Sequence, residues 1–116
     1  MTQEDFLEQK IFTGLTNKNN NEGNTDFYFS EEDFAKVLEK TAYFGIAIYT
    51  ITAINNGKEI KTVEHETFRK KATDAKWYNR EFKNLKREQE GLLFTATYKV
   101  SKKLLARDFS SSDKES

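Results

Sequence analysis

The run from Ile46 to Ile54 constrains the fold most, because it is apolar on both faces and leads straight into a turn. A strand with one face in water alternates apolar and polar residues, whereas a strand covered on both faces is apolar throughout. The run is also rich in β-branched residues, which favour strands. We therefore predict a strand that lies in the middle of a sheet rather than at its edge.

The next residues predict a hairpin. Asn55-Asn56-Gly57 supplies residues that tolerate positive φ, as a tight turn between antiparallel strands requires. The returning segment, from Glu59 to His65, is the most polar of the predicted strands. This polarity predicts an edge strand.

Two helical patterns lie on either side of the hairpin in the sequence. Ser30 is expected to cap a helix over residues 31–43, in which apolar residues recur at helical spacing and which ends at Gly45. Asp74 is expected to cap a second helix over residues 75–89.

Two further β patterns complete the domain. A short β-prone run, Phe27 to Phe29, precedes the first helix, and a period-2 alternation from Leu92 to Val100 follows the second. The order β-α-β-β-α-β predicts an α+β fold of the ferredoxin-like (split βαβ) type, an antiparallel sheet with both helices on one face. This topology hosts unrelated functions, and no motif identifies a family.

The length of 116 residues suits one domain. We expect a single α+β domain over 27–109, preceded by an arm and an Asn-rich flexible loop over 1–26 and followed by a disordered tail over 110–116. The apolar residues of the arm fit either a short helix or an added strand: Phe6, Leu7, Ile11 and Phe12.

Composition excludes several classes of function. The chain has no cysteine, which rules out disulfides, thiolate metal sites and thiol catalysis and fits a reducing compartment. The first residues carry acids where a secretory signal would carry cations, and no apolar stretch is long enough to span a bilayer. A cytoplasmic protein without a membrane partner is expected.

No constellation of residues predicts an enzyme. His65 is the only histidine, and in a strand it points away from both Glu64 and Glu66. Glu81 and Glu88 are better explained as a solvated charge pattern than as an acid–base pair. The scattered glycines form no phosphate-binding loop. We predict no catalytic residue, no metal site and no cofactor.

Charge is unevenly distributed, although the net charge is zero. Residues 1–33 hold eight acids against two lysines, whereas residues 69–107 hold twelve Lys or Arg against four acids. In the second predicted helix, four cations fall within roughly 60° of arc, opposite an apolar face. We call these cations the basic stripe: Lys76, Arg80, Lys83 and Arg87.

The basic stripe indicates a negatively charged partner. Together with Arg69, Lys70 and Lys71 it predicts a partner-binding surface, on which Trp77 would be a partly exposed anchor. We predict a small non-enzymatic module that docks an acidic protein, comparable in size and charge segregation with inhibitors such as bacterial immunity proteins. Alternatives are a nucleic-acid-binding accessory protein, a solvated face neutralised by the acidic arm, and a small enzyme or ligand-binding subunit of a dimer.

The sheet face without helices is a second candidate surface. It would let the protein act as a monomer or pair with a second copy as a homodimer, unless the arm covers it. We expect this open face to carry hydroxyl and apolar groups: Tyr28, Tyr49, Thr95, Thr97 and Lys99.

Overall fold

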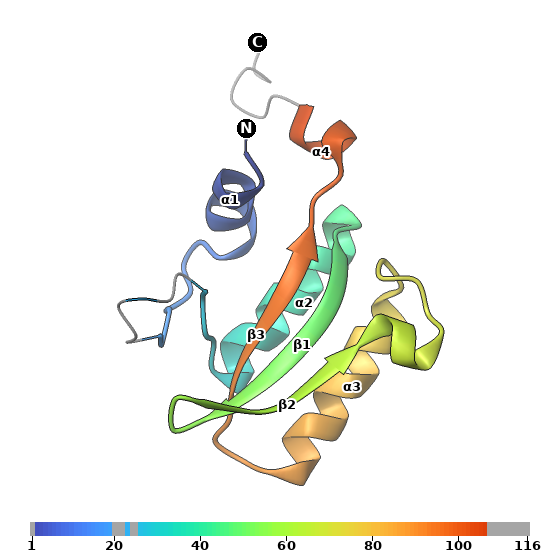
Figure 1. Ribbon diagram of the computed structural model, residues 1–116. Coiled ribbons are helices and arrows are strands. Elements are labelled where there is room, and N and C mark those ends of the chain that lie inside the picture. Colours follow the sequence, from blue (N-terminus) through green and yellow to red (C-terminus); the bar gives the residue numbers. More distant parts are fainter. Residues whose placement is uncertain (1, 20–22, 24–25, 107–116) are drawn as a thin grey trace.

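The computed structural model describes residues 2–19, 23 and 26–106 and has an α+β fold with a three-stranded antiparallel sheet (Figure 1). The predicted tail lies outside these residues. Each predicted helix is present, with small shifts at its ends. The elements are α1 (Gln3–Phe6), the π-helical turn η1 (Leu7–Ile11), α2 (Glu31–Phe44), β1 (Ala47–Asn55), β2 (Lys58–Glu64), the 3-10 turn η2 (His65–Phe68), α3 (Ala75–Glu88), β3 (Leu93–Lys99) and α4 (Lys102–Ala106).

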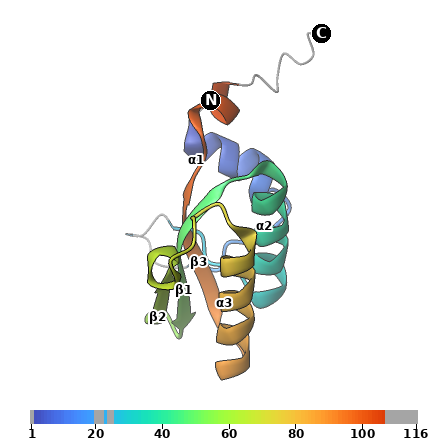
Figure 2. The ribbon, with the colours of Figure 1, turned by 90° about the vertical axis from the view of Figure 1, so that its right-hand side faces the viewer.

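The strand order β2-β1-β3 places β1 in the middle of the sheet and β2 at an edge, as the hydrophobic pattern predicts. β1 is buried along most of its length, whereas β2 is exposed except at Val63. Figure 2 shows α2 and α3 on the same side of the sheet. The other side is the open face.

The ferredoxin-like arrangement is not confirmed. That arrangement needs a full strand at residues 27–29 inside the sheet, but the structure has a single bridge there, from Phe29 to Phe94 on the outer side of β3. It would also put the polar strand β2 inside the sheet and β1 at an edge. In the structure β1, which is buried along most of its length, takes the central place instead.

The hairpin between β1 and β2 turns at Asn56 and Gly57, which have φ values of 53° and 79°. Two consecutive residues with positive φ give the turn whose twist matches the flanking strands. Near the other end of β1, the register with β3 shifts between Ile48 and Thr50. Tyr49 lies in this bulge, where the strand bends.

Side chains cap both long helices as predicted. The Ser30 hydroxyl accepts a hydrogen bond of 3.2 Å from the Asp33 amide at the start of α2. The Asp74 carboxylate accepts one of 2.9 Å from the Lys76 amide at the start of α3. Gly45 ends α2 with a φ of 71°, a conformation that costs glycine little.

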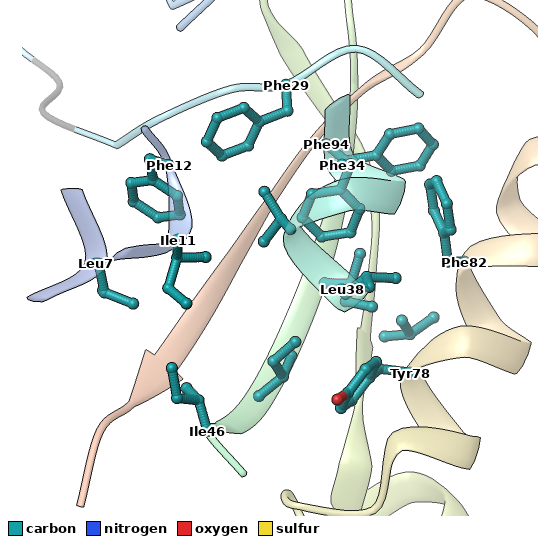
Figure 3. Packing of buried hydrophobic residues seen from close by; sticks show 14 of the residues in the cluster. Leu7, Ile11, Phe12, Phe29, Phe34, Leu38, Ile46, Tyr78, Phe82 and Phe94 are labelled. Carbon is teal, nitrogen blue, oxygen red and sulfur yellow. The ribbon is translucent and has the colours of Figure 1, made fainter. Parts of the chain in front are cut away.

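Aromatic rings fill the core between the helices and the sheet (Figure 3). Phe34 of α2 stacks on Phe94 of β3, with ring centroids 5.5 Å apart. Phe82 of α3 meets Phe94 edge-on at 4.9 Å. A buried pair of hydroxyl groups, Thr41 and Tyr78, lies 3.4 Å apart between the two helices.

The amino-terminal segment is helical and belongs to the same core. Phe6 and Ile11 are fully buried, and Phe12 packs against Phe29 and Tyr98 at centroid distances of 5.0 and 5.6 Å. The segment lies on the helix side of the sheet, beside β3 (Figures 1 and 2). Residues 3–11 are therefore helical rather than an added strand, and α1 does not lie on the open face.

Candidate functional site

All four side chains of the basic stripe are exposed. On the opposite side of α3, Tyr78, Phe82 and Leu85 are buried. The predicted division of this helix into an apolar face and a cationic face is confirmed. The stripe therefore lies along the outer surface of the molecule, where a partner has access to it.

The loop before α3 adds three exposed cations, Arg69, Lys70 and Lys71. Its shape is held by hydrogen bonds to η2, in which the Arg69 amide donates to the Glu66 carbonyl at 3.0 Å and His65 Nδ1 lies 2.7 Å from the Lys70 carbonyl. Arg69 has a φ of 55°, the left-handed conformation that turns the chain out of η2. The sole histidine therefore holds the basic loop in place.

Trp77 does not have the exposure that the sequence predicted. Only 2% of its surface is accessible, because the rings of His65 and Phe68 cover it, each with its centroid 6.3 Å from Trp77. It cannot be a surface anchor. Phe68 is more accessible, with 36% exposure. No pattern in the sequence singles out Phe68, since the residue lies between the predicted strand that ends at His65 and the predicted helix over 75–89.

A groove of about 570 Å³ runs between β2 and α3, beside the stripe. Lys61 of β2 crosses it to form an ion pair with Glu88 of α3, with Nζ and Oε2 3.1 Å apart. Glu81 accepts a hydrogen bond from Asn84, and Arg87 donates one to the same Asn84 side chain at 2.9 Å. The carboxylates beside the stripe therefore interact with other groups, and no described carboxylate forms an ion pair with the stripe.

No acid among the described residues of the arm forms an ion pair with the stripe either. α1 and α3 lie on opposite sides of α2 (Figure 1). Two acids at the start of α2 bind backbone amides, Glu31 to Gly91 and Asp33 to Thr16, each at 3.3 Å. Among the residues placed by the structure, the acidic front of the chain thus leaves the four cations without a counter-charge.

The open sheet face is less accessible than expected. Tyr28 and Thr95 are buried, with 8% and 9% exposure. Thr97 and Lys99 are exposed, and Tyr49 is 40% exposed at the bulge.

Threonines occupy the middle of this face and bind one another. The hydroxyls of Thr50 and Thr97 lie 2.8 Å apart, and those of Thr52 and Thr62 lie 2.9 Å apart. Hydroxyls paired in this way stabilise neighbouring strands. The two pairs link β1 to β3 and to β2 across this face.

No family model, curated protein or solved structure matches this chain. Within residues 2–19, 23 and 26–106, no helix has the length and apolarity needed to cross a membrane.

Proposed function

We propose that the protein is a small non-enzymatic binding module that docks an acidic protein through the basic stripe and the loop of Arg69, Lys70 and Lys71. The supporting observation is that four cations share one exposed helix face, and no described carboxylate forms an ion pair with any of them. Like charges at this spacing destabilise a helix by roughly 0.2–0.5 kcal/mol per pair. An acidic partner would remove this repulsion.

The surroundings of the stripe favour a protein partner over a nucleic acid. Glu64, Glu81 and Glu88 line the adjacent groove and would repel the anions of either partner, so they do not decide between the two. The buried ring of Trp77 is not available for stacking on bases. Phe68, half-covered in the same groove, offers the apolar contact that protein interfaces use near their centre.

The proposal is tested by titrating the protein with an oligoglutamate peptide and with a single-stranded oligonucleotide of equal charge, at low and at physiological salt. The variant changes Lys76, Arg80, Lys83 and Arg87 to Glu. The matched control changes four exposed cations outside the stripe to Glu, which gives the same net charge: Lys36, Lys58, Lys102 and Lys103.

We expect the peptide to bind more tightly than the oligonucleotide, and binding to be lost in the stripe variant but retained in the control. Tighter, strongly salt-dependent binding of the oligonucleotide would replace the proposal with a nucleic-acid-binding function. Equal loss in both variants, or no binding of the peptide even at low salt, would overturn it.

A further inference from the structure

On the outer edge of β3, the backbone of Ala96 has no strand partner among the described residues. Phe29 exchanges two backbone hydrogen bonds with Phe94, of 2.9 and 2.8 Å, on the side of β3 that faces away from β1. Outward and inward residues alternate along an antiparallel strand, so the amide and carbonyl of Ala96 point outward as well. No described strand pairs with β3 at this position.

Amide groups from other segments bind the outer edge of β3 on both sides of Ala96. Phe29 pairs at one end, and the Gln3 side chain binds at the other. The Gln3 amide nitrogen donates to the Tyr98 carbonyl at 3.1 Å, and its oxygen accepts from the Val100 amide at 2.8 Å. Ala96 therefore lies in a gap between these two groups.

A cavity of about 270 Å³, which we call the edge slot, opens at this gap. Its apolar lining includes Phe12 and Phe27, which stack on each other with centroids 4.9 Å apart. Three acids also line it, Glu4, Glu8 and Asp26, and no lysine or arginine is among the described lining residues. The edge slot is thus apolar inside and negatively charged around it.

Tyr98 provides an independent indication of a ligand. Tyr98 is among the residues that line the edge slot, and its hydroxyl is buried without a hydrogen-bond partner among the described residues. A buried polar group without a partner costs free energy, and native structures contain few of them. A ligand that brings a hydrogen-bonding group into the slot would remove this cost.

We propose that the edge slot binds an extended peptide of another protein, which pairs with the backbone of Ala96 and inserts a lysine or arginine side chain among Glu4, Glu8 and Asp26. The backbone pairing is strand addition to a free sheet edge. The charge of the lining selects a basic side chain over a neutral or acidic one. This surface is distinct from the basic stripe, since α2 lies between them, and it takes a partner of opposite charge.

Short extended peptides that differ only at the central residue test the proposal. Lys, Arg, norleucine and Glu are placed at that position, and binding is followed through the backbone amide resonances of the uniformly labelled protein. We expect the Lys and Arg peptides to bind saturably and to shift the Ala96 amide. Norleucine should weaken binding several-fold, and Glu should abolish it.

Two controls separate backbone pairing from general attraction. N-methylation of the peptide residue opposite Ala96 removes a hydrogen-bond donor without altering the protein, and should weaken binding at least as much as norleucine does. The double variant Glu4→Gln, Glu8→Gln should lose roughly threefold in affinity per carboxylate. The matched variant Glu32→Gln, Glu39→Gln changes exposed acids of α2 and should bind normally.

Equal binding of all four peptides, or shifts confined to residues away from Ala96, would overturn the proposal. So would the absence of any shift at millimolar peptide. If the Ala96 amide instead shifted as the protein alone was concentrated, the occupant would be a second copy of the chain, and a separate peptide partner would be excluded.

Discussion

Gln3 and Val100 lie 97 residues apart in the sequence and are joined by a hydrogen bond of 2.8 Å from the Val100 amide to the Gln3 side-chain oxygen. The same side chain donates to the Tyr98 carbonyl. A single glutamine thus fastens the amino-terminal helix to the end of the last strand. It also covers two backbone groups that a sheet edge would otherwise leave open.

Replacing Gln3 with Ala should lower the free energy of unfolding by roughly 1–3 kcal/mol, because two partly buried hydrogen bonds are lost together. Urea denaturation followed by circular dichroism measures this change. Gln9→Ala is the control, since Gln9 is exposed on the same segment. If both variants lose the same stability, the bonds of Gln3 contribute nothing specific.

Removing either central aromatic ring should strongly lower the free energy of unfolding. Phe82→Ala or Phe94→Ala is expected to cost about 3–5 kcal/mol, since both rings are buried and pack edge-on. The double variant should lose roughly 0.5–1.5 kcal/mol less than the sum, which is the interaction between the two rings. A loss below about 1 kcal/mol for either single variant would contradict the assigned core.

Tyr98→Phe should stabilise the protein by roughly 1 kcal/mol at neutral pH, because it removes a buried hydroxyl that has no described partner. Urea denaturation at neutral pH measures this gain. A clear loss of stability would show that the hydroxyl has a favourable interaction in the folded protein.

The same substitution should change the response to alkaline pH. Burial, and to a smaller extent the charge of Asp26, raise the pKa of Tyr98 above its ordinary value of 10.0. The unfolded chain therefore releases this proton first, so the ionisation of Tyr98 leaves the free energy of unfolding unchanged below about pH 10 and lowers it as the pH rises further. Tyr98→Phe should make the decline shallower. An unchanged slope would contradict the raised pKa.

Neutralising the middle of the basic stripe should also stabilise the free protein. Arg80→Gln removes a cation that lies four residues from Lys76 and three from Lys83, which predicts a gain of roughly 0.4–1 kcal/mol at low salt. The gain should shrink as salt screens the charges. Lys102→Gln, outside the stripe, is the control. No gain at low salt would show that repulsion within the stripe is negligible.

Local features of this fold were predictable because neighbouring residues decide them. The caps Ser30 and Asp74 and the turn at Asn56 and Gly57 depend on side chains within a few positions, and all were correct. The strand order depends on contacts between distant segments, such as Phe29 with Phe94. No local sequence pattern predicts that residues 27–29 form a single bridge instead of a full strand.

In the candidate site, too, the features decided by neighbouring residues were predictable and those decided by distant contacts were not. The exposure of the stripe follows from helix geometry alone, because its residues lie opposite the apolar face. Trp77 lies at the border of the two faces, and its burial depends on Phe68 and His65, which fold over it from η2. The edge slot is lined by residues of α1 and of β3, which are far apart in the sequence. No local sequence pattern could therefore predict it.

Because Phe12 packs against Tyr98, the amino-terminal part of the core cannot be completed until the ribosome has synthesised the last strand. At typical synthesis rates, on the order of ten seconds separate the emergence of these two residues. Throughout that interval Phe6, Ile11 and Phe12 have no completed core to enter, because the last strand has not been made. We expect the nascent chain to expose apolar surface that favours aggregation until its final strand has been made.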